Sequence, residues 1–263
     1  FVLGEVWKNP MYMGRSYIES GKGMDSVMNY NLMGAIIRYF RYGEADELAR
    51  KIREIRNTYP TDTMNTAMNF TSTHDITRGI NLWDETIFNY HGEWPWNLIN
   101  DSHEFCKQYQ LTEEQYERAK EIYMAYVFGT AFMPGIFSIF YGDEIGVEGV
   151  GNLNNRQPMP WGEKSKADKS LYDFFRVIGY IRKKEEFMHE ADIKVHNINV
   201  NYMAFERILG EEKALVVVNR TAEEQQYILP DEYKGSDQVY RFKTTDEGKL
   251  SPYGGVLIKK KIK

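Results

Sequence analysis

The stretch FVLGEVWKNP, residues 1–10, decides the fold. A short apolar run leads through Gly4 to the carboxylate of Glu5 and the indole of Trp7, and turn residues follow. An apolar run of this length that stops at a turn predicts a buried strand over residues 1–7. The polar pair therefore stands at the carboxyl end of a strand, where ligands bind in α/β folds.

Strand-like and helix-like segments alternate along residues 1–185. Strand-like runs occur at 24–30 (MDSVMNY), 68–72 (MNFTS) and 136–141 (IFSIFY). Apolar residues recur at helical spacing in the segments between and after these runs: residues 32–42, residues 45–59, the segment after the capping box Thr112-Glu113-Glu114-Gln115, and residues 170–184. The alternation predicts an α/β fold, in which helices cover a parallel sheet and each strand is buried on both faces.

The pattern changes after about residue 190, where strands follow one another without helices. Segments 195–198, 202–208 and 213–218 read as strands, and Gly210-Glu211-Glu212 reads as a hairpin loop between the last two. Further strand candidates lie near 226–229, 238–242 and 254–259. We therefore predict two domains, residues 1–188 and a small antiparallel β domain over residues 189–263.

Composition excludes several classes of function. The chain has 263 residues and a net charge of -5 without a basic patch, which argues against nucleic-acid binding. No apolar run approaches the length of a membrane span. Cys106 is the single cysteine, so neither an intrachain disulfide nor a cysteine zinc cluster can form, and we expect a cytoplasmic protein. The 19 tyrosines offer flat apolar faces with a polar group, which suits ligands such as sugars.

Three of the strand-like runs end in polar clusters: Glu5 to Trp7, His74-Asp75 and Asp143-Glu144. The carboxyl ends of parallel strands meet at one edge of a sheet, so these clusters are expected to form one site. Two carboxylates in unequal environments are the groups that cleave a glycosidic bond.

Each cluster also has a purely structural interpretation. Glu5 could pair with Lys8, and Asp75 could cap a helix that begins at Ile76. Asp143 and Glu144 could bind a metal or a sugar hydroxyl, or could hold the rim of the fold through Arg156. We expect no metal site, because too few His and Asp residues converge, and no serine triad, because a Gly-x-Ser-x-Gly elbow is absent.

The motifs LGEVW (3–7), FTSTHDITR (70–78) and YGDEIGVEGVGNLNNRQPMPW (141–161) resemble the α-amylase family of glycoside hydrolases. They look most like its neopullulanase, cyclomaltodextrinase and maltogenic amylase branch. The resemblance implies the second half of a (β/α)₈ TIM barrel followed by a small antiparallel β-sandwich domain. The four strand-like runs would be barrel strands 5 to 8, so that this chain would be the C-terminal half of such an enzyme, starting at the fifth strand.

The resemblance also implies roles for single residues. Glu5 matches the general acid/base, and Asp75 matches the carboxylate that binds the sugar hydroxyls beside the reacting carbon. His74 would bind the same sugar, and Trp7 would line the site around the acid. Arg156 and Asp143, in the loop after the last strand, would shape the substrate-binding rim. Thr73 departs from the family pattern, since many members have Asn there.

The family nucleophile is an aspartate at the end of the fourth strand, two residues after an arginine, and no such motif occurs in these residues. We therefore expect the chain alone to be inactive, and to pair with a missing N-terminal half of the barrel or to self-associate through an exposed edge. The implied substrates are maltooligosaccharides, cyclodextrins or pullulan, with α-1,4 and α-1,6 bonds. No cofactor is expected, with calcium left open for the missing half. The alternative is a non-catalytic glucan-binding or structural protein on the same fold.

Overall fold

A computed structural model describes residues 1–11, 17–19, 23–87, 103–162, 167–236, 238–244 and 247–260. The chain divides into two compact units, each described by itself below. The first comprises Phe1–Asn69, Ala125–Phe137 and Ile181–Lys263, and the second comprises Phe70–Met124 and Ser138–Tyr180.

A four-stranded sheet has the order β1-β2-β3-β4. Its strands are β1 (Leu3–Glu5), β2 (Ser26–Met28), β3 (Met68–Phe70) and β4 (Ile136–Ser138). The β1–β2 and β2–β3 pairs are parallel, as the alternation of strands and helices predicted. β4 follows a tight approach to β3, where Gly135 has a φ of 114° and a Cβ there would lie 2.3 Å from the carbonyl oxygen of Ala67. Only glycine fits this position, which explains the Pro134-Gly135 sequence.

The central strands are buried, but the two edge strands are not. Val27 in β2 and Phe70 in β3 are each 1% exposed. Strands are present within the predicted segments 1–7 and 136–141, but the predicted burial was wrong, because Leu3 of β1 is 42% exposed and Ile136 of β4 is 51% exposed. β1 and β4 pair on one side only, so the apolar content of their sequences reflects a surface that the described residues leave uncovered.

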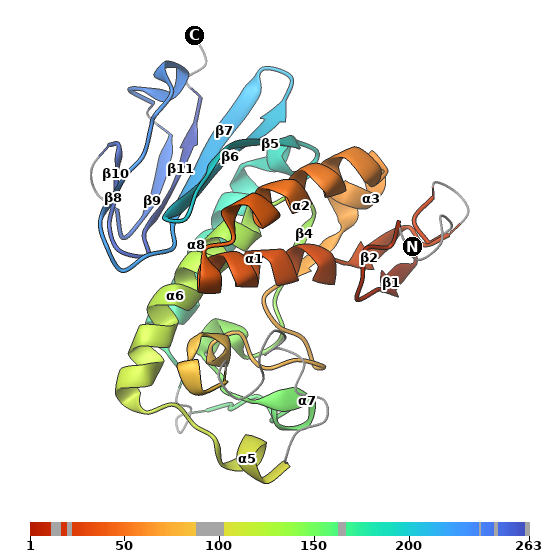
Figure 1. The fold of residues 1–263 in the computed structure, drawn as a ribbon, viewed down its shortest axis with the longest axis vertical. Helices are drawn as coiled ribbons and strands as arrows, with labels where there is room; N and C mark the ends of the chain where they lie inside the picture. The colour runs from red at the N-terminus through yellow and green to blue at the C-terminus, as the bar shows by residue number, and fades with distance from the viewer. Residues whose placement is uncertain are drawn as a thin grey trace. The chain divides into compact units, whose positions relative to one another are not determined.

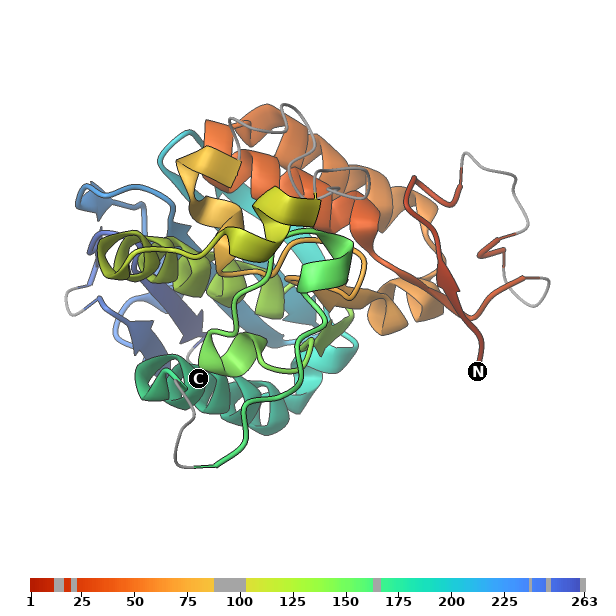
Figure 2. The same ribbon diagram turned by 90° about the horizontal axis from the view of Figure 1, so that it is seen from below.

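Helices α1 (Tyr30–Tyr42) and α2 (Ala45–Thr58) lie side by side and are followed by α3 (Thr61–Thr66) (Figures 1 and 2). The predicted end of α1 is confirmed, since Gly43 is left-handed and its N–H donates to the carbonyl of Tyr39. The apolar face of α2 is Leu48, Ala49, Ile52 and Ile55, and all four are buried.

The longest helix in the described residues is α6 (Glu113–Ala131), which begins at the predicted capping box. The side chain of Gln115 accepts from the Thr112 N–H at 2.9 Å, and the Thr112 hydroxyl accepts from the Gln115 N–H at 3.3 Å. These reciprocal bonds satisfy two N–H groups at the helix start. Further helical elements in the described residues before the β domain are α5 (His103–Gln108), α7 (Gly151–Asn154), α8 (Lys169–Lys184) and the 3₁₀ turns η1 (Asn81–Trp83), η2 (Asp143–Ile145) and η3 (Glu186–His189).

The C-terminal strands form an antiparallel sheet of five strands in the order β5-β6-β7-β11-β9 and a pair, β8 and β10. The strands are β5 (Asp192–Ile198), β6 (Tyr202–Leu209), β7 (Glu212–Asn219), β8 (Gln225–Gln226), β9 (Val239–Phe242), β10 (Lys249–Leu250) and β11 (Gly255–Lys259), and the 3₁₀ turn η4 (Asp231–Tyr233) follows β8. Leu209 pairs with Glu212, so the predicted hairpin turns on Gly210-Glu211.

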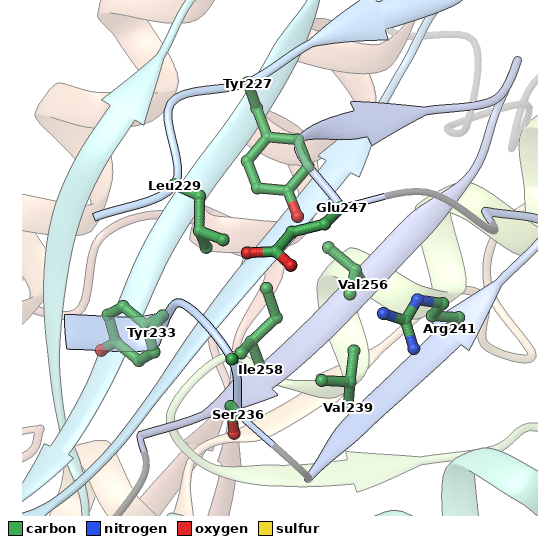
Figure 3. Close-up of a pocket in the computed structure, with 10 residues that line it drawn as sticks. Tyr227, Leu229, Tyr233, Ser236, Val239, Arg241, Glu247, Val256 and Ile258 are labelled. Atoms are coloured by element: carbon green, nitrogen blue, oxygen red, sulfur yellow. The ribbon is translucent and has the colours of Figure 1, made fainter. Parts of the chain in front are cut away.

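The core of this β domain packs residues of β6, β7 and β11 against Tyr227, Tyr233 and Leu250. Figure 3 shows Leu229, Val239, Val256 and Ile258 around a small pocket at the side of this core, with Glu247 near Tyr227 on its rim. The antiparallel character was therefore predicted correctly, whereas the sandwich form stays a prediction.

The domain boundary between residues 188 and 189 stays a prediction. Within the first compact unit, strand β5 of the β domain packs on α2. The Arg56 guanidinium contacts both carboxylate oxygens of Asp192 at 2.9 Å through Nε. The buried Arg207 donates to the carbonyls of Phe132, Met188 and Ala191. These bonds join β6 to the segment that follows α6 and to the entry of β5.

Candidate functional site

Glu5 ends β1, and its carboxylate is held from one side. The Trp7 indole donates from Nε1 to Glu5 Oε1 at 3.0 Å, and the Tyr30 hydroxyl lies 3.5 Å from the same oxygen. In the described part of the chain Glu5 makes no ion pair with Lys8, so that structural interpretation was wrong. Trp7 therefore contacts Glu5 through a hydrogen bond as well as lying beside it.

Tyr30 is the functional candidate that the sequence analysis missed. Its ring stacks on Trp7 with 4.1 Å between centroids and 13° between planes. Tyr30 is the first residue of α1, and the N-cap side chain of Asn29 accepts from the Leu32 N–H. A tyrosine two residues after a short buried strand, at the start of a helix, was the available signal.

Buried amides fix the start of α1 relative to β3. Asn29 donates from Nδ2 to Asn69 Oδ1 at 2.9 Å, and Asn69 donates from Nδ2 to the carbonyl of Pro134 at 2.7 Å. Both asparagines are buried, so these hydrogen bonds do not compete with water. The position of Tyr30 beside Glu5 is thus determined by the neighbouring strand.

Asp75 lies in the loop after β3, and both of its carboxylate oxygens have partners. Arg156 Nη2 lies 3.0 Å from Asp75 Oδ1, and His74 Nε2 lies 3.2 Å from Asp75 Oδ2. Arg156 also donates from Nε to the carbonyl of His74 at 2.9 Å. A single arginine therefore holds the backbone and the carboxylate of this pair at once, which orients Asp75 by charge and by geometry.

The interpretation of Asp75 as a helix cap was wrong. In the described residues after β3, a turn at 74–75 replaces the expected helix, and the first helical element is η1. The Asp75 N–H donates to the Thr73 hydroxyl at 3.2 Å, and Asn155 donates to the Thr73 carbonyl at 2.9 Å. The backbone of Thr73 thus ties this loop to the one after β4.

Asp143 is buried and does not contact Arg156, so the partner considered for it was wrong. Its side chain is 1% exposed, that of Arg78 is 0% exposed, and Arg78 Nη1 lies 3.1 Å from Asp143 Oδ1. Ser72 donates to Asp143 Oδ2 at 2.5 Å. Burial raises the pKa of the Asp143 carboxyl, and Arg78 and Ser72 oppose that rise.

Arg78 joins two loops through its other contacts. It donates from Nε to the carbonyl of Asn155 at 2.8 Å and from Nη1 to the carbonyl of Tyr141. Its guanidinium also lies 4.0 Å from the centroid of the Phe140 ring. These contacts favour a structural role for Asp143, as the partner of Arg78 beneath the rim, while direct substrate contact by Asp143 stays a prediction.

The predicted site residues thus form local groups: Glu5 with Trp7, Asp75 with His74 and Arg156, and Asp143 with Arg78. The convergence of Glu5 and Asp75 on one sugar ring stays a prediction. The described residues contain no group of three or more His, Cys, Asp or Glu side chains arranged to hold a metal. Within the same residues, every helix is too short or too polar to cross a membrane.

Comparisons with known proteins confirm the resemblance. No family model matches the chain. A cyclomaltodextrinase of Geobacillus thermopakistaniensis is 24% identical over 269 residues, covering 98% of this chain and 39% of that protein. Neopullulanase 2 of Thermoactinomyces vulgaris is 25% identical over 272 residues, covering 98% of this chain and 40% of that protein. The chain therefore spans less than half the length of these curated relatives.

Solved structures give the same picture for the fold. The cyclic α-maltosyl-(1→6)-maltose hydrolase of Arthrobacter globiformis, in complex with cyclic α-maltosyl-(1→6)-maltose, matches with a TM-score of 0.66 at 19% identity. The match covers 98% of this chain and 49% of that one. The homologues of this chain are thus α-glucan hydrolases, and its structural neighbours are TIM-barrel enzymes of the α-amylase family.

Proposed function

We propose that this chain is part of a retaining α-glucan hydrolase and supplies two of its catalytic carboxylates. Glu5 is the general acid/base, and Asp75 binds the hydroxyls of the sugar that reacts. The observation that carries the proposal is the placement of Glu5 at the end of β1 and of Asp75 in the loop after β3, in a chain whose homologues are cyclomaltodextrinases and neopullulanases. Ligands bind beyond the carboxyl ends of strands in such folds.

In this proposal β1 to β4 are strands 5 to 8 of an eight-stranded barrel. The parallel pairing and the sequential strand order support the assignment. The exposed apolar residues of β1 and β4 support it as well, since a closed barrel would cover both edges. The remaining strands and the nucleophile would come from a segment outside these 263 residues.

The chemistry follows from the geometry of each group. Glu5 protonates the glycosidic oxygen while a carboxylate from outside this chain attacks the anomeric carbon, and Glu5 then removes a proton from water. Asp75, oriented by Arg156 and His74, accepts hydrogen bonds from sugar hydroxyls and stabilises the distorted ring in the transition state. Trp7 and Arg156 form parts of the substrate-binding surface.

The substrates that this function implies are α-1,4 and α-1,6-linked glucans such as maltooligosaccharides, cyclodextrins and pullulan. The structural neighbour from Arthrobacter binds a cyclic maltosyl-maltose, which supports an oligosaccharide as the substrate here. The alternative is a glucan-binding protein without catalysis. The presence of both Glu5 and Asp75 in hydrogen-bonded settings favours the enzyme.

The decisive test compares a polypeptide of residues 1–263 with the protein expressed from the complete reading frame that contains it. We expect the complete protein to release reducing sugar from cyclodextrin or pullulan, and residues 1–263 alone to release none. The variant Glu5→Gln of the complete protein should lower kcat at least about 100-fold, because the proton donor is lost. Near-normal turnover by Glu5→Gln, or hydrolysis by residues 1–263 alone, contradicts the proposal.

A further inference from the structure

The two oxygens of the Glu5 carboxyl have different surroundings. Oε1 accepts the N–H of Trp7 at 3.0 Å and lies 3.5 Å from the Tyr30 hydroxyl. Oε2 has no hydrogen-bond partner in the described part of the chain. A general acid needs one oxygen that carries the proton and faces the departing group, so this asymmetry has a chemical consequence.

The indole decides which oxygen carries the proton. An indole N–H can only donate, so the oxygen that it contacts has to accept. In a protonated carboxyl the accepting oxygen is the carbonyl oxygen, and the hydroxyl is the other one. Trp7 therefore favours the arrangement in which Oε1 is the carbonyl oxygen and Oε2 bears the hydrogen.

Trp7 can orient Glu5 because the indole is itself held. Its ring stacks on Tyr30 at 4.1 Å, and Tyr30 is only 4% exposed at the start of α1. Asn29 caps that helix and is bonded to Asn69 of β3. A continuous series of packed and hydrogen-bonded groups thus runs from β3 to the Glu5 carboxyl.

We propose that Trp7 and Tyr30 are positioning residues that hold Glu5 with Oε2 as the proton-bearing oxygen, an inference that rests on the proposed function. In the first step the proton moves from Oε2 to the glycosidic oxygen, and the electron pair of the broken carbon–oxygen bond stays on that oxygen. Glu5 is left as a carboxylate. In the second step Oε2 takes a proton from the attacking water, which restores the acid.

The test separates proton delivery from other losses by the choice of leaving group. A maltooligosaccharide releases a sugar alkoxide and needs full protonation, whereas α-maltosyl fluoride releases fluoride and needs little. Trp7→Phe keeps an aromatic ring for the stack and removes the N–H. In the complete protein we expect this variant to lower kcat/KM on maltoheptaose by about 10- to 100-fold and to change kcat/KM on the fluoride by less than about threefold. The ratio kcat/KM reports the first step, in which only the sugar leaving group needs the proton of Glu5.

Two further variants refine the comparison. Tyr30→Phe keeps the stack and removes the hydroxyl from Glu5 Oε1, a contact that at 3.5 Å is long for a hydrogen bond, so its effect should be smaller than that of Trp7→Phe. The Trp7→Phe/Tyr30→Phe double variant should lose less than the product of the single losses, because both groups act on one oxygen. Tyr42→Phe, at the exposed end of α1, is the matched control and should retain the parent activity.

A selective loss on maltoheptaose supports the inference. Equal losses on both substrates, or no loss for Trp7→Phe in a protein with unchanged thermal midpoint, overturn it. Glu5→Gln distinguishes the two levels of the proposal: if that variant keeps its turnover, the acid assignment itself fails, and if it loses turnover while Trp7→Phe behaves like the parent, only the positioning role fails.

Discussion

The residue with the most demanding environment is Arg78, whose guanidinium is fully buried beside Asp143. A buried ion pair adds little to the free energy of unfolding compared with an apolar pair of similar volume. Removal of one partner, however, leaves a buried charge without compensation, which destabilises the fold. The many carbonyl contacts of Arg78 hold the loops after β3 and β4 together, and the loop after β3 carries His74 and Asp75.

We expect Asp143→Asn to reduce the free energy of unfolding by about 3–5 kcal/mol, because the buried Arg78 guanidinium loses the carboxylate that it pairs with in the described residues. The midpoint of urea unfolding, followed by circular dichroism, measures the change. The matched control is Asp173→Asn, which breaks an exposed pair with Arg176 at 3.5 Å and should cost less than about 1 kcal/mol. Equal effects for the two variants would refute the structural role of the buried pair.

For single residues, the position along the chain could be predicted from the sequence, but the side-chain partners could not. The strand-end placement of Glu5 and Asp75 was readable, because apolar runs and turn residues are local signals. The partners were not: Arg78 meets Asp143 and Arg156 meets Asp75 across the two loops, and no local pattern specifies such a pairing. Tyr30 escaped notice for the same reason, since only the stacking on Trp7 reveals its position.

At the scale of elements, helix α8 begins at a carboxylate with several donors. Asp168 accepts from the Ser170 hydroxyl at 2.6 Å, the Leu171 N–H at 3.0 Å and Lys120 Nζ at 3.0 Å. Burial alone would raise the pKa of Asp168, but these hydrogen bonds outweigh it and lower the pKa to about 2. Asp168 thus caps α8 and links it to α6.

The lowered pKa of Asp168 determines how the stability of the fold depends on pH. The ionised carboxylate is favoured in the folded state, so its stabilisation is present above the unfolded pKa of about 4 and is lost as the pH falls through about 2. At pH 7 we expect Asp168→Ala to lower the free energy of unfolding by about 1–2 kcal/mol. The difference from the parent should shrink between pH 4 and pH 2 in acid titrations of thermal stability, and a difference that stays constant over this range would contradict the role of the ionised carboxylate.

The helix ends and turns were predicted better from the sequence than the solvent exposure of the strands. The capping box of α6, the left-handed glycine after α1 and the hairpin at Gly210 are set by local conformational preferences, and all are present. Exposure of β1 and β4 was mispredicted, because an apolar run does not reveal whether a second strand covers its edge.

At the scale of the whole molecule, the two uncovered edges have a consequence for behaviour in solution. Edge strands with apolar side chains and unpaired backbone groups associate with other strands. A polypeptide of residues 1–263 is therefore expected to form dimers or larger species that sedimentation detects at micromolar concentration. Leu3→Lys, which places a charge on β1, should shift the population toward monomer, whereas Val200→Lys, at an exposed position between β5 and β6, should not. Persistent association of the Leu3→Lys variant would point to another surface.

The order of the five-stranded sheet separates sequence order from spatial order. β11 pairs with β7 on one side and with β9 on the other, so the last strand in the described residues is an interior one. During synthesis, β5 to β7 can form their meander as soon as they emerge, but β9 has no neighbour until residues 255–259 have left the ribosome. The five-stranded sheet can therefore be completed only after β11 has been synthesised. A chain that ends before Gly255 would lack β11, so one edge of β7 would stay unpaired and would be exposed to chaperones and proteases.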